Sequence, residues 1–364
     1  MTAIISAQIT AFYLFDVAEG IDLARLSALI GSEATRARLA PKPANPTYIQ
    51  YQEPPVVFDG EAANIPALGG FKSRFKAFDY GVISLALTRA FQGSWVDLIS
   101  VGQHLMENEA LEGEAEAACR KLLDRMAPAL TKVRERFLSE DYLVFAVTAL
   151  EGPITGRALI QSHGDEIALL LRGERHALSR QEKKEVLRNR ISYFAHDLVV
   201  PTWNAALVYD TEAGATAALE ILEFANSQLL EFRYYDQLLD AELARTYVEL
   251  EAPRGYDLLA GRRYARAANR LHAVFIDVNE LTDRTENALK IVGDVYAARL
   301  FTLAAARLGL DRWKANVAEK LQTLDDIYGF AVEQTSNRRG QFLELTIVLI
   351  LVLELVLILL GVMQ

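Results

Sequence analysis

Apolar positions follow two different patterns along the chain, and the change falls near residue 210. Before it, short runs of successive apolar residues alternate with amphipathic segments, and after it apolar residues recur every three or four positions. The first pattern is typical of strands that helices cover on both faces, and the second is typical of packed helices. The chain is therefore predicted to be an α+β protein, with a mixed α/β sheet domain over residues 1–210 and a coiled-coil-like bundle of long helices over residues 211–337.

Individual elements of the first domain follow from the same pattern. Six prolines between residues 41 and 66 exclude a helix there and predict an extended segment. The alternation of strands and helices indicates a sheet with helices packed on it. We expect strands at residues 9–15, 80–91, 141–149, 167–171 and 205–209, and helices at residues 22–30, 94–107 and 114–137.

The second part is predicted to be a helical stalk. Helices are expected at residues 214–251 and 257–307, and Gly309 is expected to end the second of them. A third helix follows. The lengths of the second and third helices require either a break in the second, near Asn279 or Gly293, or a bend at residues 336–340, and the bend is favoured because a polar stretch and a glycine coincide there. The apolar seam of this third helix consists of Trp313, Val317, Leu321, Leu324, Tyr328 and Ala331.

A nearly uncharged apolar stretch closes the sequence. Residues 345–363 contain a single charge, Glu354, and a helix of that length spans about 28 Å, close to the thickness of the hydrocarbon core. We therefore predict a transmembrane helix over residues 342–363. A buried core helix is the alternative, although a helix that is apolar on every face needs a large protein around it.

Charged residues in and beside this stretch predict its orientation and role. Arg338 and Arg339 flank its upstream end, and the positive-inside rule then places the bulk of the chain in the cytoplasm. This predicts a tail-anchored, single-pass inner-membrane protein of a prokaryote. Glu354 falls at the middle of the span, where a charge costs about 2.5–3.5 kcal/mol. We expect Glu354, with Glu344 nearer the interface, to mediate homo-oligomerisation; a tolerated carboxylic acid in a monomeric span is the alternative.

Composition narrows the class of protein without revealing its chemistry. The chain has 38 basic and 48 acidic residues and a formal charge of −10, which argues against a broadly basic nucleic-acid binder. Cys119 is its only cysteine, so the chain has no intramolecular disulfide and no metal site built from several cysteines.

Basic side chains nevertheless concentrate in one segment of the first domain. Residues 172–190 contain seven lysines and arginines against three glutamates, and no acidic helix adjoins them in the sequence. This favours a site for RNA, anionic lipid or an acidic partner, and a solvated helix face is the alternative. The residues assigned to this polyanion or partner site are Arg180, Lys183, Lys184, Arg188 and Arg190.

The search for catalytic motifs is negative. The sequence lacks the GxxxxGK[ST], GxGxxG, HExxH and GxSxG patterns of common nucleotide-binding proteins and hydrolases. His196 and Asp197 are adjacent, and adjacent residues of a strand point to opposite faces, so a structural role is favoured over an acid–base pair. The polar run at residues 226–236 favours a buried polar network over an active site. We therefore predict no enzyme activity, cofactor, metal or small-molecule substrate.

Two segments resemble a known family. The run from Arg338 through Glu344 to Glu354 resembles the C-terminal signature of the "required for meiotic nuclear division" family, domain of unknown function 155, in which two glutamates lie ten residues apart. Leu345 stands where that family often has tryptophan. Residues 78–84 resemble its aromatic-Gly-Val strand. The resemblance implies a membrane-attached, oligomeric protein without established enzyme activity, whose mitochondrial relatives tether ribosomes at the inner membrane.

Together these features lead to two functional hypotheses. The first is a membrane-anchored, non-enzymatic, homo-oligomeric scaffold or tether that presents its cytoplasmic domain to ribosomes, RNA or other translation components. The alternative is a homo-oligomeric ion conduit of magnesium-channel-like layout, with Glu354 facing the axis.

Overall fold

The chain forms two compact units. The computed structural model describes residues 4–31, 35–36, 53–65, 69–251, 273, 276 and 295–359. Contacts group Met1–Tyr234 with Thr282–Lys314 in the first unit, and Tyr235–Leu281 with Ala315–Gln364 in the second. The domain boundaries expected from the sequence stay a prediction.

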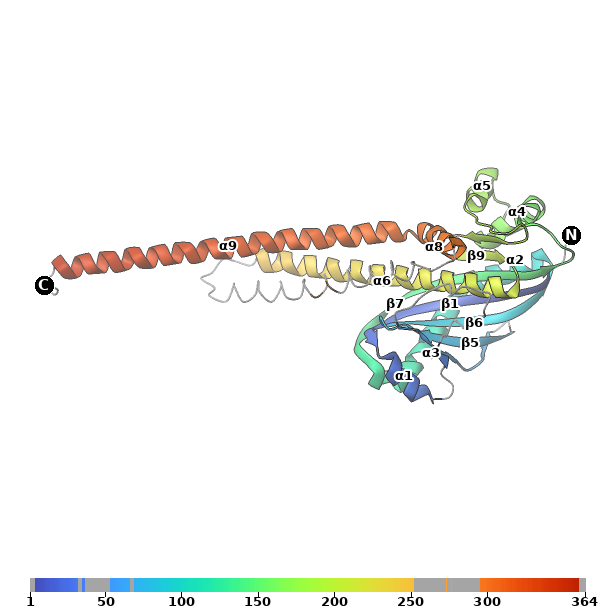
Figure 1. Cartoon of the computed structure of the whole chain (residues 1–364), viewed down its shortest axis with the longest axis horizontal. Coiled ribbons are helices and arrows are strands. Elements are labelled where there is room, and N and C mark those ends of the chain that lie inside the picture. The colour runs from blue at the N-terminus through green and yellow to red at the C-terminus, as the bar shows by residue number, and fades with distance from the viewer. Residues whose placement is uncertain are drawn as a thin grey trace. The chain divides into compact units, whose positions relative to one another are not determined.

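A mixed sheet lies at the centre of the first unit (Figure 1). Its strands are β1 (Ile4–Ile21), β2 (Thr35–Arg36), β3 (Val56–Asp59), β4 (Ala63–Ile65), β5 (Gly69–Ala77), β6 (Val82–Gly93), β7 (Leu130–Leu150), β8 (Leu198–Pro201) and β9 (Ala205–Tyr209). Their order is β2-β3-β5-β6-β1-β7-β9-β8, and β4 pairs with β5. Strands β7 and β9 are parallel, and the other pairs are antiparallel.

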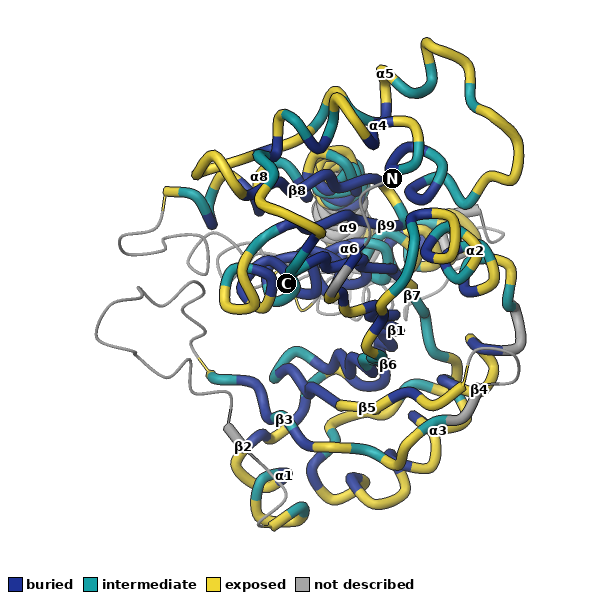
Figure 2. The backbone as a smooth tube through the Cα atoms, turned by 90° about the vertical axis from the view of Figure 1, so that its right-hand side faces the viewer, coloured by how far each residue is buried: buried dark blue, intermediate teal, exposed yellow. Residues whose placement is uncertain are grey.

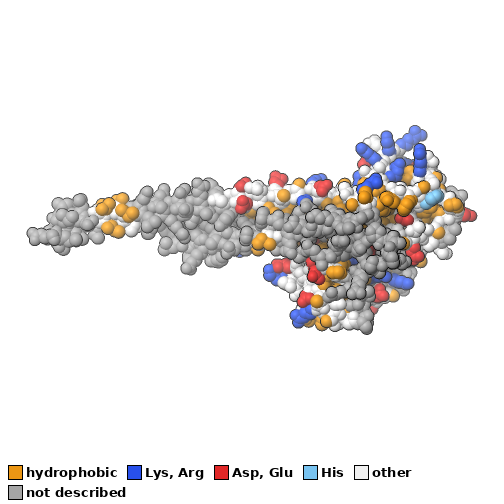
Figure 3. All heavy atoms as spheres, in the orientation of Figure 1, with side chains coloured by type: hydrophobic (Ala, Val, Ile, Leu, Met, Phe, Trp, Pro, Cys, Tyr) orange, Lys and Arg blue, Asp and Glu red, His pale blue; other side chains and the backbone are white. Residues whose placement is uncertain are grey.

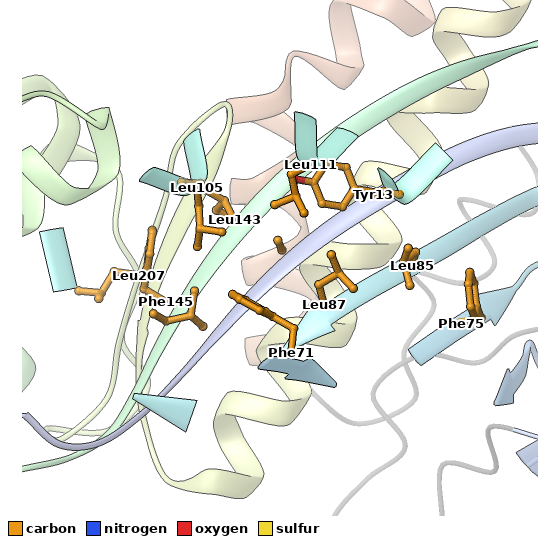
Figure 4. Close-up of a cluster of buried hydrophobic side chains, with 14 of the residues drawn as sticks. Tyr13, Phe71, Phe75, Leu85, Leu87, Leu105, Leu111, Leu143, Phe145 and Leu207 are labelled. Atoms are coloured by element: carbon orange, nitrogen blue, oxygen red, sulfur yellow. The ribbon is translucent and has the colours of Figure 1, made fainter. Parts of the chain in front are cut away.

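The hydrophobic core lies between one face of this sheet and a layer of helices. Alternate side chains of the strands point into it, among them Phe71, Leu85 and Phe145 (Figure 4). Since parallel strands need a crossover connection, the chain passes from β7 to β9 through two of these helices, α4 (Gly156–Arg172) and α5 (Arg180–Arg188), and then through β8. The helices that contribute to this core are α1 (Leu23–Ile30), α2 (Trp95–Met106), α3 (Glu109–Met126), α4 (Gly156–Arg172) and α5 (Arg180–Arg188).

The opposite face of the sheet is covered by the first part of α6 (Glu212–Glu251) and by α8 (Val295–Leu308). Phe224 of α6 and Phe301 of α8 pack together with ring centroids 5.7 Å apart, and α8 contacts β8. Phe12 and Leu14 of β1, which point away from the first core, are also buried. A sheet covered on both faces explains why its central strands are apolar at successive positions, as the sequence predicted.

Of the eight elements predicted for the first domain, six agree with the structure and two do not, and the strands β2, β3, β4, β5 and β8 and the helix α5 were not predicted. Residues 167–171, expected to form a strand, lie in α4, which Thr155 caps at its start and Gly173 ends in the left-handed region. An apolar run of five residues fits either a strand or one face of a helix, so periodicity alone cannot decide between them. The helix expected at residues 114–137 ends at Met126, and β7 begins at Leu130.

Two long helices form the described part of the second unit. Lys320 of α9 (Leu310–Leu359) lies 2.7 Å from the carboxylates of both Asp236 and Asp240 of α6. Val317 and Leu324 of the predicted seam are buried, which confirms the seam at these two positions. Gly309, with φ +72°, separates α8 from α9, as predicted.

The bend expected at residues 336–340 is wrong, because α9 continues through them without interruption. The helix expected at residues 257–307 falls largely outside the described residues, although α8 forms its last part.

The predicted transmembrane helix at residues 342–363, and with it the tail anchor, is also wrong. In the part of the chain that the structure describes, no helix is both long and apolar enough to cross a membrane. The mixed α/β part of the predicted architecture stands without the membrane segment.

Candidate functional site

The basic segment forms helix α5 on the surface of the first unit. Ser179 caps the helix by accepting a hydrogen bond from the Glu182 backbone N–H at 3.1 Å, and Val186 is buried against the core. The side of α5 that carries Val186 therefore faces the core, while the other positions of the helix are half-buried or exposed (Figure 2).

Part of the basic segment is committed to ion pairs within the first unit. Arg172 lies 2.6 Å from Glu182, and Lys183, which is only 22% exposed, lies 2.5 Å from Asp165 of α4. Arg175 pairs with Glu107, at the end of α2. These cations join α5 and the α4–α5 connection to neighbouring helices, so their role is at least partly structural.

The other four predicted cations are exposed. Arg180, Lys184, Arg188 and Arg190 make no ion pair with any residue that the structure describes. The first three are spaced i, i+4 and i+8, which places them on one stripe of the helix about 6 Å apart along its axis. Figure 3 shows lysine and arginine side chains gathered over this part of the molecule. We call these four residues the cation stripe.

Such a stripe is unfavourable for the helix that carries it. Like charges at i, i+4 destabilise an isolated helix by about 0.2–0.5 kcal/mol per pair, and α5 has only 9 residues. Glu182 and Glu185 lie between the cations in the sequence but do not pair with them. Glu182 pairs with Arg172, and the Glu185 carboxylate lies 3.9 Å from Arg307. The arrangement suits a surface whose positive charge is balanced by a bound anion.

An ordered loop follows the cation stripe and carries two exposed rings, Tyr193 and Phe194. The buried Asp197 carboxylate accepts hydrogen bonds from the backbone N–H groups of both residues, each at 2.7 Å. The ring of His196 contacts the Ile154 carbonyl oxygen at 3.1 Å. His196 and Asp197 therefore serve to hold the loop, as the sequence interpretation favoured. The two rings were missed, although an aromatic pair closely follows Arg188 and Arg190 in the sequence.

The predicted polar network is buried between the second sheet face and α6. Asn226 and Glu231 are at most 1% exposed, Tyr80 shares a hydrogen bond of 2.7 Å with Ser227, and Lys76 pairs with Glu223. The Lys76–Glu223 and Tyr80–Ser227 pairs compensate for the burial of Lys76, Glu223 and Ser227.

One further pair in this network is Asp16 on β1 with Arg134 on β7. Arg134 Nε lies 2.6 Å from the Asp16 carboxylate, and the guanidinium lies 3.4 Å from the centroid of the Tyr234 ring. Burial raises the pKa of Asp16 to about 6, although the arginine charge and hydrogen bond act to lower it. This pair is a structural element that the sequence interpretation did not identify.

Other candidate groups do not form a reactive centre in the described residues. No group of three or more His, Cys, Asp or Glu side chains is placed there to hold a metal ion. Burial raises the pKa of Cys119 to about 12, so its thiol is not activated as a nucleophile.

The remaining predicted site residues lie in α9. Glu344, Glu354, Arg338 and Arg339 belong to its continuous helical backbone, and their side chains lie outside the described residues. The roles of Arg338 and Arg339 beside a membrane span fall with the span itself, whereas oligomerisation through Glu344 and Glu354 stays a prediction.

Comparisons with known proteins correct the predicted family. The family model described as "Uncharacterized protein MJ0711, N-terminal domain" matches residues 6–216. The uncharacterized protein MJ0711 of Methanocaldococcus jannaschii is 23% identical over 237 residues, which cover 65% of this chain and 71% of the relative. No solved structure matches the chain.

The resemblance to the "required for meiotic nuclear division" family is therefore wrong. Its specific motif was a short tail of aliphatic residues and two glutamates, and such a composition arises readily in unrelated sequences. The match at residues 6–216 instead spans β1 through the beginning of α6 and includes the cation stripe and its adjoining loop. This chain belongs to the family defined by the N-terminal domain of the uncharacterized protein MJ0711.

Proposed function

We propose that this protein is a non-enzymatic binding protein whose cation stripe binds a polyanionic partner. The observation that carries the proposal is the row of exposed cations at Arg180, Lys184 and Arg188, continued by Arg190, without carboxylate partners among the described residues. On a chain of net charge −10, such a local concentration of positive charge attracts anions to one place on the surface.

The cation stripe differs from an ordinary solvated helix face because the neighbouring carboxylates pair with other cations of the first unit. Glu182 and Glu185 lie near arginines outside the stripe, and Asp165 pairs with Lys183, so the acidic residues nearby do not neutralise the stripe. The scaffold or tether role expected from the sequence is compatible with such a site, with RNA or a ribosome as the polyanion. The conduit interpretation required a membrane-spanning helix, and no observation on the described residues favours it.

Neutralising the stripe should weaken polyanion binding without unfolding the protein. We expect the triple variant Arg180→Gln, Lys184→Gln, Arg188→Gln to bind inorganic polyphosphate at least tenfold more weakly. With a single-stranded polyanion such as an RNA oligonucleotide, the slope of log K against log salt should become shallower by about 2, because about 0.7 counterions are released per neutralised phosphate. Titration by fluorescence anisotropy at several salt concentrations measures both.

A matched control keeps the same change in net charge. Arg25, Lys121 and Arg125 are also exposed cations of the first unit, far from α5 in the sequence, and their replacement by glutamine should leave binding nearly unchanged. Melting temperatures of both triple variants should lie close to the wild type, since exposed charges contribute little to stability. Equal weakening by the two triple variants would mean that only net charge matters and would overturn the proposal.

A further inference from the structure

The two exposed rings beside the cation stripe are unusual for a folded surface. Tyr193 is 59% exposed and Phe194 is 71% exposed. Their ring centroids are 4.8 Å apart and their planes meet at 90°. Exposed apolar groups that lie together on an otherwise polar surface commonly mark a binding site.

The loop that carries the rings is held in place by its backbone. Asp197 binds both ring-bearing residues through their backbone N–H groups, and Gly156 N–H donates to the Ala195 carbonyl oxygen at 2.9 Å. Ile191, which precedes the rings, forms a bridge with Val199 of β8. On one side the Tyr193 ring also contacts the Tyr296 ring of α8, with 5.6 Å between centroids. The rings are therefore displayed by an ordered framework, so little ordering is needed when a ligand binds.

The rings adjoin the cation stripe. Arg190 precedes Tyr193 by three residues, so their Cα atoms are at most about 11 Å apart. Figure 3 shows hydrophobic side chains at the surface beside the gathered lysines and arginines. A single extended ligand is long enough to contact both.

The combination of charges and rings selects one class of polyanion. Polyphosphate and acidic peptides present negative charge without a row of flat rings, and a duplex hides the faces of its bases in the stack. A single strand offers phosphates to the cations and base faces to aromatic side chains. Rings at right angles to each other also require bases that can be splayed apart, which an unpaired strand allows.

From this geometry we infer that the surface formed by the cation stripe, Tyr193 and Phe194 binds single-stranded nucleic acid, with phosphates along α5 and unpaired bases stacked on the two rings. This inference rests on the proposed polyanion-binding function and names its ligand class. Binding depends on base faces and not on base edges, so little sequence preference is expected.

The test compares several probes at one salt concentration. Fluorescence anisotropy is measured with a mixed-sequence single-stranded RNA, the single-stranded DNA of the same sequence, the corresponding RNA duplex, inorganic polyphosphate and polyglutamate. We expect the wild type to bind the single-stranded RNA at least tenfold more tightly than the duplex. Comparison of the RNA with the DNA of the same sequence shows whether the sugar contributes to the affinity.

Variants separate stacking from charge. Phe194→Leu keeps an apolar side chain without a ring and should weaken single-strand binding about tenfold while leaving polyphosphate binding unchanged. Trp203→Leu is the matched control, because Trp203 is 63% exposed at the turn between β8 and β9, four residues beyond Val199. It should leave single-strand binding unchanged. Thermal melting verifies that both variants fold.

The outcomes distinguish this inference from the proposed function. If single strand and duplex bind equally and Phe194→Leu changes neither, the inference is overturned while polyanion binding stands. If Phe194→Leu weakens polyphosphate and RNA equally, the ring does not contact bases, and the inference is again overturned. Tighter binding of polyglutamate than of RNA would identify an acidic protein as the partner. Absence of binding to every probe would overturn the proposed function itself.

Discussion

Replacement of Arg134 by methionine is expected to lower the free energy of unfolding by about 3–5 kcal/mol at pH 8, and by markedly less at pH 5. The Asp16 side chain is completely buried, and Arg134 is its ion-pair partner at 2.6 Å. Removal of one member of a buried pair leaves the other charge uncompensated, which is costly. Urea denaturation of wild type and variant at each pH measures the difference.

The pH dependence follows from the direction of the Asp16 pKa. Burial raises this pKa from 3.8 to about 6 in the folded protein, so between these values the folded state binds more protons than the unfolded state. Stability contributed by Asp16 is therefore present at low pH and is lost as the pH rises from about 4 to about 6. Without Arg134 the pKa rises further, and the loss continues to higher pH. At pH 5 the carboxyl is largely protonated in both proteins, so the arginine matters less.

Two controls isolate the buried charge. The double variant Asp16→Asn, Arg134→Met has no carboxylate to compensate, so it should recover part of the stability at pH 8 and lose the additional pH dependence. Lys121→Met removes a member of an exposed pair, since Lys121 and Glu61 are 71% and 88% exposed, and should change stability little at either pH. If Arg134→Met lowers the free energy of unfolding equally at pH 5 and pH 8, the effect comes from the packing of the arginine's aliphatic part and not from its charge.

Replacement of Gly81 by alanine is expected to lower the free energy of unfolding by about 2–5 kcal/mol. Gly81 lies between β5 and β6 with φ +97°, in the left-handed region that favours glycine. A Cβ there would lie only 1.9 Å from the Ala18 carbonyl oxygen, a backbone atom of β1, which pairs with β6 on one side and β7 on the other. The left-handed conformation costs a residue with a Cβ about 1–2 kcal/mol, and crowding adds about 1–3 kcal/mol or more.

Gly69 provides a matched control for this substitution. It also has positive φ, +82°, but nothing lies within 4 Å of the position of a Cβ. Gly69→Ala should therefore cost only the conformational part, about 1–2 kcal/mol. Urea denaturation of both variants gives the comparison. Equal losses would contradict the close approach of Gly81 to β1.

Local patterns were sufficient for much of the first unit. The strand at residues 205–209 was predicted with its observed bounds, and the helices at 22–30 and 94–107 match α1 and α2, whose Asp22 and Ser94 caps are sequence-local signals. Gly309 likewise marks the end of α8. These features depend on neighbouring residues only, so they are readable before the fold is known.

The candidate site shows a different limit. The basic segment was recognisable from composition, but the sequence could not divide its cations into paired and exposed ones. Lys183 and Lys184 are adjacent in the sequence, yet Lys183 pairs with Asp165 of α4 whereas Lys184 is exposed. The helix α5 turns one face to the unit and the other to solvent, and the position of α4 decides which lysine meets a carboxylate.

The apolar and charged patterns of the chain were enough to predict a helix-covered sheet followed by long helices, because burial requires periodicities that can be counted along the sequence. They misled where one pattern fits several environments, as with the apolar stretch that suggested a membrane span and a family. The pairing of Asp16 with Arg134, the approach of Gly81 to Ala18 and the presentation of Tyr193 and Phe194 were decided by the fold. Each joins residues whose contact depends on strand order and register, and these are set by the packing of the whole unit.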